Sequence, residues 1–566
     1  MRQLTALDAQ FLNVESATTT AHVAGLAILD PADGAVTRDA LAGLLLDRIH
    51  LSPALSLRLV PVPFGLDHPY WAADPAFDIA NHLFETVLPE PGDQRRLADE
   101  VARIHARRLD RAHPLWEMHL IRGLAGGLVA VYTKVHHAAI DGVTGAETLA
   151  ALLDLAPGER RATASRAGAT VVPLRAPAGT RGRGAGRAEK HPPSAAAETQ
   201  APDASPARTH GPTTDPARTH GPSADAARTH GPSADPAQAH APSADPAQAH
   251  APSADPADDE GPGLVRMLAG AALRNATQPV RALRSVVRAA TDLDAIPLVS
   301  TLPGAGLIAR TARLVSGDRH ERPEVPRLAA PRTPFNGPVS AERRVSFGSV
   351  PLKDVKSVAK ANGISVNDVV MTLCASALRS WLVERDALPE EPLVAAVPVA
   401  VRAGDAREGM GNHISAMVAP LPTNVAGARE RLRETGAAMR AAKRRFAQAP
   451  ASWLEDLCSV LPAPVTTLAT PALFRLASVA FPPVNIIVSN VPGPQFPLYL
   501  CGGRVLSYYP LSVVSDVSGG LNITCFSYDG MLDFGVVACP ERVDDVWGLL
   551  GHLRAALDEL LDLDRD

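Results

Sequence analysis

The chain has 566 residues, of which 46% are hydrophobic and 20% are charged, with a formal net charge of −5. This length and apolar fraction predict two or more domains with buried cores. A charge so near balance excludes a globally basic protein, so no nucleic-acid partner is expected.

The start of the chain, "MRQLTALDAQFLNVES", lacks the charged and apolar regions of a secretory signal. No uninterrupted apolar run approaches the roughly 18 residues that a spanning helix needs. The five cysteines are scattered without CxxC spacing, which favours free thiols in a reducing cytosol over disulfides or a zinc site. We therefore expect a cytoplasmic protein whose contact with a membrane, if any, is peripheral.

The first folded segment, 1–157, contains the run "GLVAVYTKVHH", which is apolar, β-branched and typical of a strand. Side chains of a strand alternate between its faces, so His137 shares a face with Val131 and Val135, and His136 points to the opposite side with Lys134. Two histidines that point apart do not readily hold one metal ion. A metal site is therefore not expected here.

A helix is predicted next in "TGAETLAALLDL", where Thr144 and Glu147 have the spacing of a capping box. Asp141 and Gly142 then lie in the tight turn between strand and helix. A glycine in such a turn permits backbone angles that a Cβ would block. A histidine at the end of a strand is well suited to act as a general base, because its usual pKa lies near neutral pH.

Residues 158–261 are rich in Ala, Pro, Ser, Gly, Arg and His and contain a recurring decapeptide, as in "PARTHGPSAD". A proline-rich period of ten residues buries no core, which predicts a disordered linker. Histidines recur in it ten residues apart. Ordering a flexible chain around one metal ion costs much entropy, so we do not expect the repeat to bind metal.

Residues 262–322 return to helical periodicity in "GLVRMLAGAALRNATQPVRALRSVVRAATDL", where arginines supply the charge and no acid precedes Asp292. Such a basic amphipathic segment favours an anionic lipid surface. A connecting helix with solvated arginines, packed on a domain, explains the pattern equally well. Both interpretations stay open.

The last segment, 323–566, has a helical pattern at about 365–383 and strand-like runs in "LVAAVPVAVR", "VNIIVSN", "LNITCFSYDG" and "LDFGVVAC". Strands and helices alternate in both folded segments, which predicts an α/β fold.

The motif "HHAAIDG" resembles the HHxxxDG motif of chloramphenicol acetyltransferase-like, CoA-dependent acyltransferases. Further stretches resemble one branch of them, the bacterial wax ester synthase/diacylglycerol acyltransferases. These stretches are "LTALDAQFLNVES", "HPLWEMHLI" with its PLW element at 114–116, "SVNDVVM" with its ND element at Asn367 and Asp368, "GNHIS", "VSNVPGP" and "LNITCFSYDGMLDFGVVA". The resemblance covers both folded segments, and the repeat appears as an insertion outside it.

The resemblance implies two similar lobes, joined by the long linker, with the active site at their interface. It implies acyl-CoA as a substrate, no cofactor or metal, and diacylglycerol or a long-chain alcohol as acceptor. Peripheral association with a membrane or lipid droplet is expected for such substrates. His137 would be the general base, which contributes typically about 10²–10⁴-fold to a rate.

Five other positions support the motif in this interpretation: His136, Asp141, Gly142, Asn367 and Asp368. His136 is expected to have a structural role behind the site, and Asp141 is expected to form an ion pair, with Arg402 as the suggested partner. Asn367 is a candidate to shape the oxyanion site, although a cap at the start of a helix explains an asparagine there as well.

Two other functions remain open on the sequence. The first is an acyltransferase of the polyketide or condensation-domain type that acts on a carrier-protein-bound substrate. Such members often carry DFGWG, whereas this chain continues Asp533, Phe534 and Gly535 with two valines, which favours the lipid branch. The second is a non-catalytic lipid-surface protein, which the intact histidine motif argues against.

Overall fold

The structure is a computed structural model of the chain. It describes residues 1–31, 34–140, 145, 148, 151–157, 263, 266–275, 310–311, 330–400, 414–448, 455, 458–459, 462–480 and 483–563. All of these belong to one compact unit, Met1–Ala162 with Asp255–Asp566. The predicted linker 158–261 and most of 262–322 lie outside the described residues.

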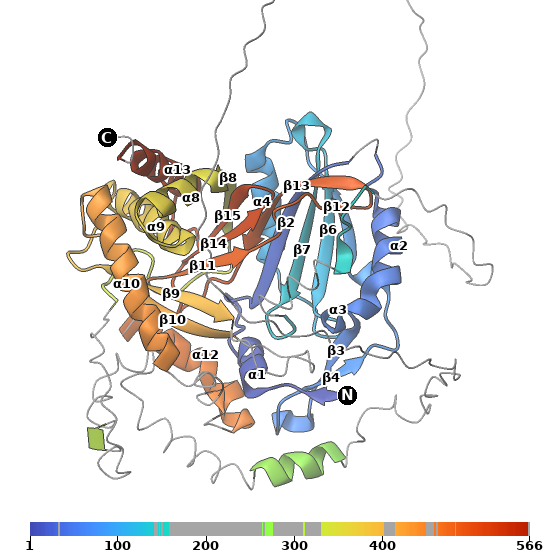
Figure 1. The fold of residues 1–566 in the computed structure, drawn as a ribbon. Coiled ribbons are helices and arrows are strands. Elements are labelled where there is room, and N and C mark those ends of the chain that lie inside the picture. The colour runs from blue at the N-terminus through green and yellow to red at the C-terminus, as the bar shows by residue number, and fades with distance from the viewer. Residues whose placement is uncertain are drawn as a thin grey trace, which may run out of the picture. The chain divides into compact units, whose positions relative to one another are not determined.

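The described part of the chain forms two six-stranded sheets, which confirms the α/β class with two sheet-rich lobes (Figure 1). The first sheet has the strand order β12-β13-β2-β7-β6-β5. Its strands are β2 (His22–Asp30), β5 (Leu83–Val87), β6 (Trp116–Arg122), β7 (Val129–His136), β12 (Tyr499–Leu500) and β13 (Gly503–Leu511). Strands β2 and β7 are antiparallel, with His22 opposite His136 at one end of the pair.

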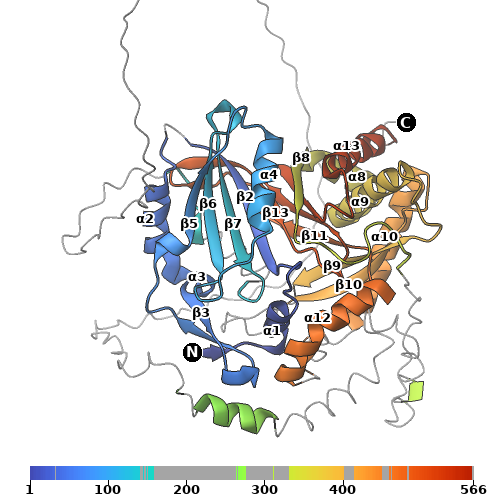
Figure 2. The ribbon, with the colours of Figure 1, turned by 180° about the vertical axis from the view of Figure 1, so that it is seen from behind.

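The two faces of the first sheet bury different layers. Val129, Val131 and Val135 pack with leucines of α2 (Arg38–Arg48) and α3 (Pro53–Ser56). On the opposite face, Ala130 and Tyr132 pack with α4 (Gln94–His105), which also lies beside β8 (Figure 2). The alternation predicted for this strand is therefore present in the fold.

Short elements complete the first lobe. They are α1 (Ala6–Asn13), the 3-10 turns η1 (Ile49–Leu51), η2 (Pro63–Gly65), η3 (Ile79–Asn81) and η4 (Ala125–Gly127), and a small sheet of β1 (Arg2–Gln3), β4 (Tyr70–Ala73) and β3 (Leu57–Val60). Thr5 caps α1 in a reciprocal capping box with Asp8.

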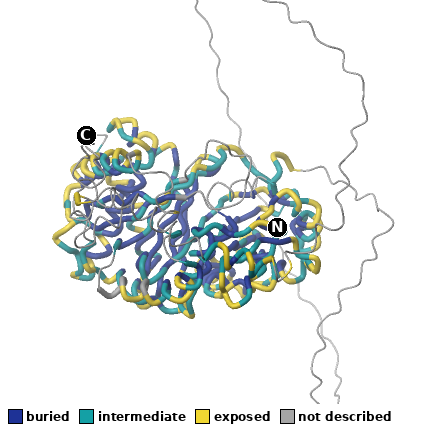
Figure 3. The backbone as a smooth tube through the Cα atoms, turned by 90° about the horizontal axis from the view of Figure 1, so that it is seen from below, coloured by how far each residue is buried: buried dark blue, intermediate teal, exposed yellow. Residues whose placement is uncertain are grey.

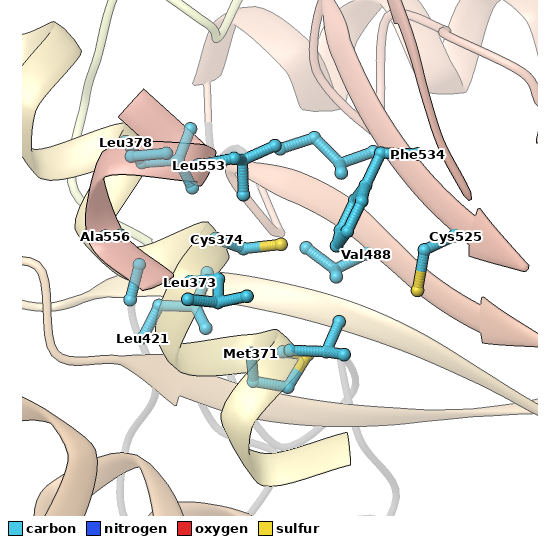
Figure 4. Close-up of a cluster of buried hydrophobic side chains, with 14 of the residues drawn as sticks. Met371, Leu373, Cys374, Leu378, Leu421, Val488, Cys525, Phe534, Leu553 and Ala556 are labelled. Atoms are coloured by element: carbon cyan, nitrogen blue, oxygen red, sulfur yellow. The ribbon is translucent and has the colours of Figure 1, made fainter. Parts of the chain in front are cut away.

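The second sheet has the order β10-β9-β11-β14-β15-β8. Its strands are β8 (Arg344–Pro351), β9 (Leu393–Ala400), β10 (Ile414–Leu421), β11 (Ile486–Pro492), β14 (Leu521–Tyr528) and β15 (Met531–Ala538). The second lobe also contains α8 (Leu352–Ala361), α9 (Val366–Val383), α10 (Ala428–Gln448), α12 (Ala463–Ala480) and α13 (Val546–Leu563). Cys374 of α9 faces Val488 and Phe534 of the sheet in the buried core (Figure 4).

Strands β12 and β13 depart from the division expected at residue 323. They belong in sequence to the last segment, yet β13 pairs with β2 along Ala24–Asp30 and so extends the first sheet. On its way β13 passes very close to β15, where a Cβ on Gly535 would lie 1.9 Å from the carbonyl oxygen of Pro510. A side chain at Gly535 would therefore push the two sheets apart.

Buried residues lie in the interior and exposed residues lie along the periphery (Figure 3). Within the described ranges, no helix combines the length and apolar character needed to cross a bilayer. All five cysteines are free, as expected.

Candidate functional site

His137 lies directly after β7, where the strand turns, and it is partly buried. Its backbone amide donates to the carbonyl of Ala21 at 2.8 Å, which continues the β2–β7 pairing by one hydrogen bond. Its imidazole stacks on the ring of Phe11 in α1, with centroids 4.1 Å apart and planes 1° from parallel. The backbone and the plane of this ring are therefore both held by the N-terminal segment.

His136 is buried and faces a different partner. Its Nδ1 accepts a hydrogen bond from the amide of Ala138 at 3.0 Å. Because Nδ1 accepts, the proton of the neutral ring lies on Nε2. That atom lies 3.3 Å from Oε1 of Glu15.

Glu15 joins the histidine pair to the rest of the first lobe. Its Oε1 accepts a hydrogen bond from the amide of Ala21 at 3.2 Å, and its Oε2 accepts one from Nη2 of Arg111 at 2.7 Å. Burial opposes ionisation of this carboxyl, but the neighbouring His136 and Arg111 prevail and lower the pKa of Glu15 to about 2. An ionised carboxylate therefore stands behind the histidine motif at neutral pH.

A second buried polar group lies further along the same face of β7. Lys134 is fully buried, with Nζ 3.2 Å from Oε2 of Glu117 and hydrogen bonds to the carbonyls of Ile104 and Arg107. Burial lowers the pKa of Lys134 to about 8, against the opposing effect of Glu117. Strand alternation predicts this face for Lys134 but indicates no partner for it.

Several predicted site residues lie outside the described residues. Asp141, Gly142 and the proposed partner Arg402 are among them, as are residues 144, 146–147 and 149–150 of the predicted helix 144–155. The residues just before them, 138–140, are buried in the core under the valine face of β7. In the described part of the chain, no three His, Cys, Asp or Glu side chains are grouped as a metal site would need.

Asn367 and Asp368 lie in the first turn of α9, and neither is its cap. Ser365 is the N-cap, and it forms a capping box with Asp368, so the alternative of Asn367 as the cap is wrong. Instead Oδ1 of Asn367 accepts from Nδ2 of Asn490 at 3.2 Å. This contact brings the ND element together with the "VSNVPGP" stretch of β11.

Helix α1 also contacts the second lobe. The hydroxyl of Thr470 in α12 donates to Oε1 of Gln10 at 3.1 Å. Near the end of α1 is a cavity of about 200 Å³ lined by Val14, Ser16, Thr19, Pro471, Ala472, Arg475, Ser515 and Asp516. Two of these residues flank Glu15, so the cavity adjoins the segment that supports His136.

Three residues that the sequence did not indicate therefore support the two histidines: Phe11, Glu15 and Arg111. Phe11 and Glu15 lie in the quoted stretch "LTALDAQFLNVES", but no spacing rule connects them to residues 136–137. The arrangement presents one partly buried imidazole, that of His137, stacked on Phe11, and it places the buried carboxylate of Glu15 against the neighbouring His136. Such an imidazole is able to accept a proton from a bound hydroxyl group.

Comparison with known proteins gives matches over both lobes. Residues 4–208 and 231–370 match the wax ester synthase/diacylglycerol acyltransferase catalytic domain, and residues 410–561 match the WS/DGAT C-terminal domain. The first match extends to residue 208 and resumes at 231, so the part of 158–261 outside the resemblance is narrower than expected.

Individual relatives are similar over the full length. A putative diacylglycerol O-acyltransferase of Mycobacterium tuberculosis is 31% identical and covers 100% of this chain and 91% of its own. A probable diacylglycerol O-acyltransferase of the same species is 30% identical, over 98% of this chain and 97% of its own. The solved wax ester synthase/diacylglycerol acyltransferase of Marinobacter aquaeolei is similar in fold, with a TM-score of 0.59, 24% identity and full coverage of both chains.

Proposed function

This chain belongs to the wax ester synthase/diacylglycerol acyltransferase family, and on that premise we propose that it is an acyl-CoA-dependent O-acyltransferase that acylates diacylglycerol, a long-chain alcohol, or both. The relatives named as diacylglycerol O-acyltransferases match along nearly the whole chain, and the motif "HHAAIDG" is intact. Acyl-CoA is a substrate in this proposal, and no cofactor takes part.

His137 is the general base in the proposed reaction. It takes the proton of the acceptor hydroxyl as the hydroxyl oxygen attacks the thioester carbonyl carbon. The tetrahedral intermediate then carries its negative charge on the former carbonyl oxygen. When the carbon–sulfur bond breaks, the CoA thiolate leaves and receives the proton from the imidazolium, which restores the base.

The observation that supports this role most strongly is the pair of contacts around His137. Stacking on Phe11 restricts rotation of the ring, and the bond from its amide to Ala21 fixes its backbone. A base that is already oriented loses little freedom when the acceptor binds, which lowers the barrier of the transfer step.

Asn367 remains the proposed contributor to the oxyanion site. Its Oδ1 accepts from Asn490, so its amide NH₂ group is directed away from that partner. An NH₂ donor near the carbonyl oxygen would stabilise the negative charge as it develops. We assign Asp368 a structural role, because it is buried in the capping box and lies 3.5 Å from Nζ of Lys443.

The insolubility of both acceptors also supports peripheral association with the inner face of the cell membrane or with lipid droplets. An enzyme that binds such a surface reaches its acceptor without waiting for the acceptor to dissolve.

A thiol-release assay with palmitoyl-CoA tests the activity, with hexadecanol and diacylglycerol offered separately. We expect release of CoA with at least one acceptor and an ester product of matching mass. Absence of release with both acceptors, in a folded protein, would contradict the proposal and would favour a carrier-protein-bound acceptor.

A further inference from the structure

Several large apolar side chains are strongly exposed on three neighbouring elements of the first and second lobes. Phe64 of η2 is 91% exposed, Leu468 of α12 is 82% exposed, and Leu273 of the helix 266–275 is 68% exposed. Isolated exposed leucines are ordinary on a protein surface, whereas a contiguous group needs an explanation.

Contacts between the three elements show that the group is contiguous. Helix α12 packs beside η2. The helix 266–275 is attached to the loop after η2, because Arg274 pairs with Asp67 and Nδ2 of Asn275 donates to the carbonyl of Leu66 at 3.0 Å. Both ribbon views place α12 beside α1, with the helix 266–275 below them (Figures 1 and 2).

Local structure holds these side chains outward. Phe64 sits between Pro63 and Gly65 with φ of 59°, at the tip of a tight turn. In α12 the exposed apolar residues Val465, Leu468, Ala472 and Leu476 recur at helical spacing. A helix of a water-soluble surface normally shows polar residues on that face, so the pattern of α12 is reversed.

The charges on these elements are mainly positive. The cations are Arg266 and Arg274 of the helix 266–275 and Arg475 of α12. The single acid among the described residues of these elements and of the loop after η2 is Asp67, and it is paired with Arg274. Apolar side chains bordered by arginines match the chemistry of a bilayer with anionic headgroups.

We propose that Phe64, Leu66, Leu273, Val465, Leu468 and Leu476 form a docking surface for an anionic phospholipid bilayer. The choice of a bilayer rests on the proposed function, in which the acceptor is a water-insoluble lipid. Docking here brings α1 close to the membrane, because Gln10 of α1 is bonded to Thr470 of α12. Phe11, the next residue, stacks on His137, so the surface adjoins the site that receives the lipid.

The bilayer was chosen over two other occupants. A second copy of this chain would have to bury the arginines against one another, which like charges oppose. Another segment of the same chain would shield these side chains from vesicles, so absence of wild-type binding in the test below would favour that occupant. Both alternatives are outcomes of the test below.

Flotation of the purified full chain with vesicles tests the proposal, with no substrate present. Vesicles of phosphatidylcholine alone are compared with vesicles that also contain phosphatidylglycerol. We expect binding to the second kind, weakened by salt because its electrostatic part is screened. The variants Phe64→Glu and Leu468→Glu should each weaken binding about tenfold or more, because each places a charge where an apolar group would be buried.

The matched control is Val87→Glu. Val87 is also 67% exposed, but it is the last residue of the edge strand β5. It lies at the far end of the sheet from His136. This variant should float like the wild type, and Phe64→Trp should float at least as well. Positions 64 and 468 are exposed to solvent, so the two glutamate variants should unfold at the same temperature as the wild type.

The proposal would be overturned if the wild type and both glutamate variants floated equally well. Absence of vesicle binding by the wild type would also overturn it. A dimer in solution that these variants dissociate would identify a second copy as the occupant instead. The two proposals fail separately: a chain that floats but releases no thiol contradicts the enzyme activity, and one that releases thiol without floating contradicts the docking surface.

Discussion

Nε2 of His136 and Oε1 of Glu15 lie 3.3 Å apart, and this contact joins the histidine motif to the N-terminal segment. The same carboxylate oxygen accepts from the amide of Ala21, whose carbonyl in turn accepts from the amide of His137. The two histidines therefore share one support although their side chains have different surroundings. We infer that Glu15 is a positioning residue for His137.

Replacement of Glu15 by Gln tests this role. Glutamine keeps an acceptor for Ala21 but removes the charge that faces His136 and Arg111. The pKa of Glu15 near 2, against an ordinary 4.5, corresponds to roughly 3 kcal/mol of stability at neutral pH. We expect Glu15→Gln to lower the free energy of unfolding by about that amount and kcat by about tenfold, measured by urea titration and thiol release.

The stability lost in Glu15→Gln should depend on pH, because folding lowers the pKa of Glu15. A carboxyl whose pKa is lowered by folding contributes stability above pH 4.5, and that contribution is lost as the pH falls toward 2. The difference between wild type and Glu15→Gln should therefore shrink over that range. The control Glu100→Gln removes the carboxylate partner of Arg103, whose own side chain is 57% exposed, and should change stability by less than about 1 kcal/mol. Equal effects of the two substitutions would contradict the role of Glu15.

Phe11→Leu tests the stacking on His137. Leucine keeps most of the apolar contact but loses the flat surface on which the imidazole lies. We expect a fall in kcat of about tenfold with little change in KM, because a freely rotating base is less well oriented. Phe11→Tyr preserves the stack and should retain most of the activity. If Phe11→Leu has wild-type kcat, the stack does not orient the base.

Gly535→Ala tests the close approach of β13 and β15. The added methyl group would lie 1.9 Å from the carbonyl oxygen of Pro510, so one of the strands has to move. We expect a loss of about 3 kcal/mol in the free energy of unfolding. Gly551→Ala is the control, since a methyl group there meets no atom within 4 Å in α13 and alanine favours helix. A thermal melt in which both variants match the wild type would show that the strands separate easily.

Asp533, near the same junction, should show a pH dependence opposite to that of Glu15. Burial raises the pKa of Asp533 to about 6, although hydrogen bonds from Ser349 and from the amide of Tyr508 oppose the shift. Asp533 therefore contributes roughly 3 kcal/mol to the free energy of unfolding below pH 3.8, and this contribution is lost as the pH rises through 6. Asp533→Asn should lack this dependence in urea titrations between pH 3.5 and 7. Parallel curves for the two proteins would contradict it.

The sequence predicted what depends on local periodicity. The helix expected at about 365–383 is α9, Val366–Val383, because its apolar residues and the Ser365–Asp368 capping box lie within one segment. The strand before His137 and its two faces followed from alternation alone. The resemblance of the HHxxxDG, PLW and ND elements predicted the family, which the full-length matches confirm.

Contacts between distant segments were not predictable in this way. Nothing in "GRVLSYYPL" indicates that β13 leaves its neighbours in sequence to pair with β2, because strand pairing depends on the whole sheet. The supports of the site are of the same kind, since Phe11 and Glu15 meet residues 136–137 only after folding. The roles of Asp141, Gly142 and Arg402 stay predictions, as these residues lie outside the described part of the chain.

The central claim is that His137 removes the proton from the acceptor hydroxyl. The direct measurement is the initial rate of CoA release from palmitoyl-CoA by His137→Ala, with the better acceptor saturating. We predict a fall of about 10²–10⁴-fold, with thermal unfolding and circular dichroism like those of the wild type. A folded His137→Ala protein that releases CoA at the wild-type rate would contradict the account.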